Sequence, residues 1–206
     1  MIGCDSSESS KPQVTTFGDQ LTTVQSGRSD KIIVPEVLIT DSDLASMGKL
    51  DTLTHLELTR TNISDRGIEA LKPLVKLEVL VMGDTRITQR GLVIIGGLTK
   101  LTRLGFASSE VNDDALAELA RLPNLDNLRL GSRLVTDAGM QHLARLRNLK
   151  SLILRDTPIT DEGLKPLVAL EKLESLYLEN TKVTEAGAKF LTEKRPELHV
   201  HFPESK

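Results

Sequence analysis

The sequence has almost no aromatic residues and a single cysteine. Aromatic side chains make up 2% of the 206 residues, tryptophan does not occur, and Cys4 stands alone. A core without large rings must be built from aliphatic side chains, and one cysteine can form neither an internal disulfide nor a multi-cysteine metal site. We therefore expect a fold that depends on packing and has no cofactor.

The sequence also lacks a basic excess and a long apolar run. Its formal net charge is −3, from 26 basic and 29 acidic residues. Nucleic-acid binding normally requires a basic excess or a concentrated basic stripe, so we expect no nucleic acid as a partner. No apolar segment approaches the roughly 20 residues that a membrane-spanning helix needs. The length fits one domain with a substantial core.

A repeat of 24 residues organises most of the chain. Leucine recurs at this step (77 − 53 = 24) at Leu53, Leu77, Leu101, Leu125, Leu149 and Leu173. Two more apolar positions follow three and five residues later, as Leu56 and Leu58 follow Leu53. This L-x-x-L-x-L spacing is typical of a short strand with one buried face, because strand side chains alternate between two faces. The pattern continues for one repeat at each end, which predicts eight short parallel strands.

A turn and a short helix are predicted after each strand. The helix-start column holds residues whose side chains can accept a hydrogen bond from an otherwise unpaired backbone amide; it consists of Ser64, Thr88, Asn112, Thr136, Thr160 and Thr184. Small residues occupy the first helical turn, namely Gly67, Gly91, Ala115, Gly139, Gly163 and Gly187. Because glycine weakens a helix, we interpret this column as a close approach between the helix start and the sheet.

The segment LKSLILRDTPITDEGLKPLVAL resembles a leucine-rich repeat of the 24-residue bacterial form, with Thr where many families carry Asn. It is similar to the repeats of GALA-like proteins and of F-box-associated proteins, over roughly residues 29 to 202. The resemblance implies an α/β leucine-rich-repeat solenoid, with a curved parallel sheet of about eight short strands on the concave face and short helices on the convex face. It also implies a ladder of hydroxyl side chains that bond the loop backbone, at Thr61, Thr85, Ser109, Thr157 and Thr181. Arg133 departs from this ladder, and Ser132 is a candidate substitute.

Outside the repeat domain at 29–202, we predict a disordered tail or tether at 1–16, an N-terminal cap at 17–28 and a C-terminal tail at 203–206. Ile2-Gly3-Cys4 resembles the end of a bacterial lipoprotein signal, although the basic and apolar stretch that should precede the cysteine is missing. Two interpretations stay open. The protein is a lipoprotein of the bacterial envelope, anchored in the membrane through Cys4, if the true start lies upstream. Otherwise it is a cytoplasmic protein with an incidental thiol.

We expect the partner-binding residues on the exposed face of the sheet. The predicted site consists of Glu57, Val81, Arg103, Arg129, Ile153, Arg155 and Tyr177. The three arginines lie on a diagonal, because each follows the last by one repeat plus two positions (129 − 103 = 26). Arg155 faces Glu179 on the next strand, whereas Arg103 and Arg129 have no adjacent acid in this register. Exposed arginine and aromatic side chains are enriched at protein interfaces.

These observations favour a non-catalytic module that binds a protein and acts as a monomer. The alternative is a protein that binds an envelope carbohydrate or another small ligand, for which Tyr177 offers the aromatic platform. A solvated face without any partner is a third reading, and an adaptor of a ubiquitin-type system is a poor one because the first 30 or so residues are too polar for its helical module. His199 and His201 share a strand face without an evident third metal ligand. No catalytic set or nucleotide-binding loop is apparent, so we expect no enzyme.

Overall fold

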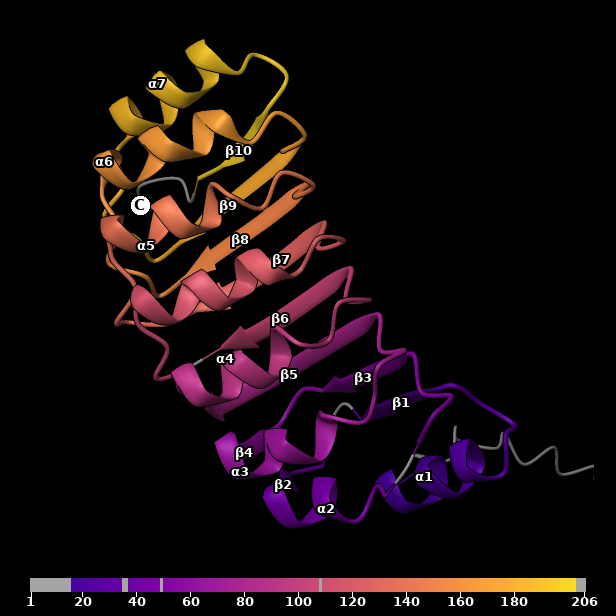
Figure 1. Ribbon diagram of the computed structural model, residues 1–206. Helices are drawn as coiled ribbons and strands as arrows, with labels where there is room; N and C mark the ends of the chain where they lie inside the picture. The colour runs from indigo at the N-terminus through magenta and orange to yellow at the C-terminus, as the bar shows by residue number, and fades with distance from the viewer. Residues whose placement is uncertain (1–15, 35–36, 49, 108, 203–206) are drawn as a thin grey trace, which may run out of the picture.

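The computed structural model describes residues 16–34, 37–48, 50–107 and 109–202, which form one continuous array of repeats (Figure 1). Eight parallel strands hydrogen-bond in chain order: β1 (Lys31–Val34), β3 (His55–Leu58), β5 (Val79–Arg86), β6 (Arg103–Ala107), β7 (Asn127–Gly131), β8 (Ser151–Arg155), β9 (Ser175–Glu179) and β10 (His199–His201). Paired residues lie 24 positions apart, as Leu56 and Leu80 do, with one shift after Met82. The predicted sheet is confirmed.

Helical segments cover the other face of the sheet (Figure 1). They are α2 (Asp41–Ala45), α3 (Asp65–Ile68), η1 (Glu69–Leu71), α4 (Gln89–Ile95), η2 (Asp114–Arg121), α5 (Asp137–Leu143), α6 (Asp161–Leu164), η3 (Lys165–Ala169) and α7 (Glu185–Lys194), where η marks a 3-10 helix. Packed helices need about 8–10 Å of spacing and paired strands about 4.8 Å, so the array bends toward the sheet. We call the exposed face of the sheet concave and the helical face convex.

Two further short strands, which the sequence pattern does not predict, lie at the beginning of the array. β2 (Ile39–Thr40) pairs with β4 (Thr61–Ser64), and β4 pairs with the extended end of β5. They form in the turns that connect the main strands to the helices. The first repeats therefore have a second, smaller ladder beside the concave sheet.

The core is an aliphatic layer between the sheet and the helices. The leucines that define the repeat, from Leu53 to Leu173, are completely buried. Phe106 replaces an aliphatic residue in one strand and is also buried. Burial of a leucine side chain contributes about 1.5–3 kcal/mol, so a column of them in every repeat can hold the array together.

Hydroxyl side chains join neighbouring repeats where the strands end. Thr61, Thr85 and Ser109 donate to the carbonyls of Asp84, Ala107 and Gly131 over 2.6, 3.4 and 3.1 Å. These bonds agree with the ladder that the resemblance implies. The Thr181 hydroxyl instead accepts a bond from the backbone of Val183 (3.4 Å).

Ser132 supplies the buried hydroxyl in the repeat of Arg133, but it donates to the preceding repeat, whereas Thr61, Thr85 and Ser109 donate to the following one. Its buried hydroxyl lies 2.7 Å from the carbonyl of Val111, while Arg133 is exposed. Thr157 departs from the implied ladder, because its buried hydroxyl has no hydrogen-bond partner among the residues that the structure describes. The loop ladder is therefore present in the first repeats and altered in the later ones.

A second contact between repeats, which sequence analysis did not find, joins the helix starts. The Asp137 carboxylate accepts bonds from the backbone amide and the hydroxyl of Thr160, both over 2.7 Å. The same two bonds join Asp41 to Ser64, Asp65 to Thr88, Asp113 to Thr136 and Asp161 to Thr184. We call this set the aspartate ladder.

The glycine column lies against the aspartate ladder. A Cβ atom on Gly163 would be 2.4 Å from Oδ1 of Asp137, and the nearest atom at Gly67, Gly91, Gly139 and Gly187 is likewise an Oδ1 of the preceding repeat's aspartate. The predicted approach to the sheet is therefore wrong. The glycines leave room for a carboxylate from the preceding repeat.

Both ends of the described array are covered by polar contacts. In α1 (Phe17–Gln25), the Gln20 carboxamide bonds both the N–H and the carbonyl of Ile33 over 2.6 Å, as a neighbouring strand would. At the other end, Arg195 is 7% exposed and its guanidinium donates to the carbonyls of Leu170, Glu171 and Leu173. A hydrogen bond from Arg195 lowers the pKa of the Glu197 carboxyl.

The predicted domain boundaries remain predictions. Cys4, most of the predicted tail at 1–16 and the tail at 203–206 lie outside the described residues. Within the described part of the chain, every helix is too short or too polar to cross a membrane.

Candidate functional site

The seven residues of the predicted site lie on six neighbouring strands and share the concave face. They are Glu57 on β3, Val81 on β5, Arg103 on β6, Arg129 on β7, Ile153 and Arg155 on β8, and Tyr177 on β9. The three arginines are exposed and the other four residues are partly buried. Alternation along each strand explains this placement, because each of these residues lies next to at least one side chain that is buried in the core.

The three arginines differ in their acidic neighbours. Arg155 pairs with Glu179 on the adjacent strand over 2.8 Å, as predicted. Arg103 faces Val79 and Asn127 on the adjacent strands, so it has no adjacent acid, as predicted. Its Nη1 atom nevertheless lies 4.0 Å from Glu57 Oε1, so the expectation that its charge is unpaired is wrong. The strand register pairs residues on adjacent strands only. Glu57 on β3 and Arg103 on β6 are separated by β5, and their long side chains meet across it.

Arg129 is the arginine that keeps its charge uncompensated. It forms no ion pair with any residue in the described ranges, and its guanidinium is exposed. On the neighbouring strands it faces Gly105, which has no side chain, and Ile153, which is apolar. A cation in this setting is available to a negative group from outside the protein.

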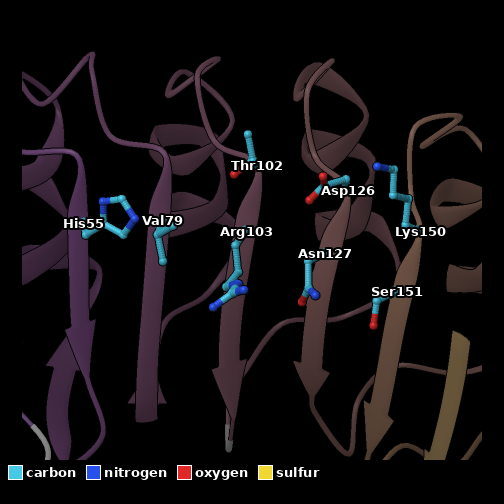
Figure 2. Close-up of a pocket in the computed structure, with 8 residues that line it drawn as sticks. All are labelled: His55, Val79, Thr102, Arg103, Asp126, Asn127, Lys150 and Ser151. Atoms are coloured by element: carbon cyan, nitrogen blue, oxygen red, sulfur yellow. The ribbon is translucent and has the colours of Figure 1, made fainter.

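Three adjoining hollows follow β6 along the concave face, and together we call them the β6 groove. The first, of about 410 Å³, lies at the strand starts and is lined by His55, Arg103, Asn127, Lys150 and Ser151 among others (Figure 2). The second, of about 230 Å³, is lined by Glu57, Val81, Arg103, Gly105, Arg129 and Ile153. The third, of about 280 Å³, lies toward the strand ends between Gly83, Ala107, Arg129 and Arg155.

Gly105 forms the floor of the β6 groove, and sequence analysis did not select it as a site residue. A Cβ atom at this position would make an ordinary contact of 3.4 Å with Val81. At Gly83, by contrast, a Cβ atom would be 1.8 Å from the Thr59 carbonyl oxygen. The fold therefore requires glycine at position 83 but not at position 105. The signal for Gly105 was a glycine in the middle of a strand, which often marks a close approach of a ligand or another backbone.

Tyr177 is less available than the sequence suggested. Its ring stacks on His201 with a centroid distance of 4.0 Å and an interplanar angle of 4°. One face of the ring is therefore covered. Among the described residues, no group of three or more His, Cys, Asp or Glu side chains is placed to hold a metal ion, and this includes His199 and His201.

A separate hollow of about 410 Å³ lies at the loop edge of the array. It is lined by Ser109, Ser132, Arg133, Leu134 and Asp156 among others. It coincides with the repeat in which Arg133 leaves the hydroxyl ladder, and Leu134 is 53% exposed there. Irregular loop geometry thus opens a second surface away from the sheet.

Comparisons with known proteins support the repeat assignment. A family model described as "Leucine Rich repeat" matches residues 49–72 and 145–168. A search of curated protein sequences finds no significant match. The kind of repeat, GALA-like or F-box-associated, stays a prediction.

Solved structures resemble the whole array. An internalin (inlF) from Listeria monocytogenes aligns with a TM-score of 0.67 and 20% identity, over 90% of this chain and 51% of the internalin. Internalin C2 from the same organism aligns with a TM-score of 0.67 and 24% identity, over 85% of this chain and 71% of internalin C2. The ectodomain of the Arabidopsis receptor kinase HAESA, solved with a peptide hormone, aligns with a TM-score of 0.50 and 22% identity. The alignment covers 71% of this chain and 24% of the HAESA chain. The chain thus spans about half the length of the first internalin, and these likenesses establish the fold.

Proposed function

We propose that this α/β leucine-rich-repeat solenoid is a non-catalytic interaction module that binds another protein on its concave face. The observation that carries the proposal is Arg129, which is exposed at the centre of the sheet without an acidic partner among the described residues. It lies between two hollows and beside Ile153. An arginine flanked by small and apolar side chains is typical of the residues that contribute most to protein interfaces.

The rigidity of the concave face supports the same proposal. Its side chains project from a parallel sheet that is hydrogen-bonded along its whole length, so little conformational entropy is lost when a partner binds. The HAESA ectodomain was solved with a bound peptide hormone, so at least one solenoid of this fold class accepts a polypeptide ligand. The carbohydrate alternative is weaker, because His201 covers one face of the Tyr177 ring.

Site-specific photo-crosslinking tests the proposal. A photoreactive residue at Ile153 on the concave face should capture a protein from a lysate of the source organism. The same residue at Val93, which is 45% exposed on the convex helix α4, should not capture it. Capture through Val93 alone would contradict a concave binding site.

The captured protein then provides a quantitative test. Arg129→Ala should weaken its binding at least about fivefold, which corresponds to about 1 kcal/mol. Arg145→Ala serves as the control, because Arg145 is an exposed arginine two residues after the end of the convex helix α5. Equal dissociation constants for the wild type and Arg129→Ala would exclude Arg129 from the interface.

A further inference from the structure

We infer that the β6 groove recognises an extended acidic peptide segment that lies along β6 and places an Asp or Glu side chain on Arg129. The inference rests on the proposed function and specifies the chemistry of the partner. It follows from the direction of the groove, from the side chains that close its two sides and from the charge at its centre.

Each hollow extends over several strands, from β3 or its end to β8, and the three hollows follow one another along the strand direction. The first and second share Arg103 and Asn127, and the second and third share Val81, Gly105 and Arg129. They accompany β6 from Arg103 to Ala107, which at a rise of about 3.3 Å for each of the four steps is roughly 13 Å. An extended peptide of about five residues has the same length.

Side chains that already have partners stand on both sides of this path. Toward β3, Glu57 is held by Arg103. Toward β9, Glu179 is held by Arg155, and beyond it Tyr177 is stacked on His201. A segment that crossed the whole sheet would have to pass over both pairs, whereas a segment along β6 meets only Arg103, whose side chain is turned toward Glu57 on β3.

The centre of the groove selects a carboxylate. Arg129 presents a planar guanidinium, which can donate two parallel hydrogen bonds to one carboxylate. Because Gly105 has no side chain, an acidic side chain can approach Arg129 from above β6. Ile153 on the other side reduces hydration, and a less hydrated ion pair is stronger. Arg103 and Arg155 already have the acidic partners Glu57 and Glu179, and Asp126 and Asp84 line the first and third hollows, so selection of a carboxylate depends on Arg129 itself.

Peptide arrays test the chemistry directly. The probes are acetylated and amidated heptapeptides with a central Asp or Glu, Asn or Gln, phosphoserine, or Lys, and with the other positions randomised. The wild-type chain should retain peptides with a central acid, and replacement of that acid by its amide should lower affinity at least tenfold. Arg129→Gln should abolish the discrimination, whereas Arg145→Gln should keep it.

Several results would overturn the inference. They are failure to retain acidic peptides, equal affinity for acid and amide, or discrimination that survives in Arg129→Gln. Stronger retention of phosphoserine than of Asp and Glu would assign a phosphopeptide instead. In each case crosslinking through Ile153 can still succeed, so failure of the acidic-peptide assignment is separable from failure of the proposed function.

Two experiments test whether the peptide lies along β6: a substitution that fills the groove, and a spin label on the peptide. Gly105→Val should fill the groove without changing the charge and should reduce peptide affinity at least tenfold, while Ser175→Val on β9 should not. A nitroxide at one end of the best-retained peptide should broaden backbone resonances at one end of β6, near Thr102 or near Ala107. Broadening confined to β3 and β9 would mean that the peptide crosses the strands, and it would overturn this orientation.

Discussion

The aspartate ladder and the concave face are built from the same repeat, yet they vary in opposite ways. In the ladder an aspartate, a Ser or Thr and a glycine recur from Asp41 to Gly187 with the same two hydrogen bonds. In the middle column of the concave face the residues change from Glu57 to Val81, Gly105 and beyond. Positions that repeat hold neighbouring repeats together, while positions that vary are free to form a specific surface.

The single break in the described ladder sharpens this comparison. Gln89 stands where the other repeats have an acid, and the next repeat then has Asn112 at the helix start and Ala115 in place of glycine. That repeat forms the 3-10 helix η2 instead of an α-helix. Ala115 occurs where no aspartate carboxylate has to be accommodated, which predicts that the three residues of each set depend on one another.

The largest effect is expected in the core layer that both regions share. Leu128→Ala should destabilise the fold by about 2–5 kcal/mol, because it removes completely buried methyl groups and leaves a cavity. Lys150→Ala, which changes an exposed side chain, should cost far less. Urea denaturation measures both, and equal midpoints would contradict the buried position of Leu128.

The aspartate ladder can be broken by one methyl group. Gly163→Ala should destabilise the fold by about 1–3 kcal/mol, because the added Cβ would lie 2.4 Å from Asp137 Oδ1. Gly18→Ala in the first turn of α1 is the control, since its Cβ would find its nearest neighbour at 3.8 Å. It should leave stability unchanged or increase it.

A double-mutant cycle tests whether the ladder residues act as a unit. In an Asp137→Gln background, which copies the natural Gln89 and Ala115 combination, Gly163→Ala should lose most of its cost. Strictly additive free energies of unfolding would refute the coupling between the two residues.

Gln20 does not belong to the repeat, yet it holds the edge of the sheet by its two hydrogen bonds to the backbone of Ile33. Gln20→Ala should cost about 1 kcal/mol and should speed amide exchange at Ile33, which loses both hydrogen bonds to the carboxamide. Gln25→Ala at the exposed end of the same helix should do neither. An unchanged exchange rate at Ile33 would mean that Gln20 does not cover the sheet edge.

The smallest effect is expected on the concave face. Arg129→Ala should change the free energy of unfolding by less than about 0.5 kcal/mol, because the side chain is exposed and unpaired among the described residues. Arg195→Ala should destabilise clearly, because its guanidinium is buried against three carbonyls. Thermal denaturation measures both variants. A lower melting temperature for Arg129→Ala than for Arg195→Ala would contradict the expectation that Arg129 does not stabilise the fold.

The sequence alone determined the solenoid, the number of main strands, their register and the face on which each strand residue lies. A fixed step of 24 residues leaves one parallel pairing that keeps every leucine column buried. The same register placed Arg155 opposite Glu179 and aligned the three arginines, so most of the candidate surface followed from residue spacing.

Only the tertiary structure decided contacts that depend on side-chain reach and on exact backbone distance. It joined Glu57 to Arg103 across β5, placed the Asp137 carboxylate where Gly163 leaves room, and paired Gln20 with the backbone of Ile33. It also distinguished Gly83, which the Thr59 carbonyl requires, from Gly105, which the fold does not require. Residue spacing fixes which backbones are neighbours, whereas the free volume between them and the direction of long side chains depend on the packed array as a whole.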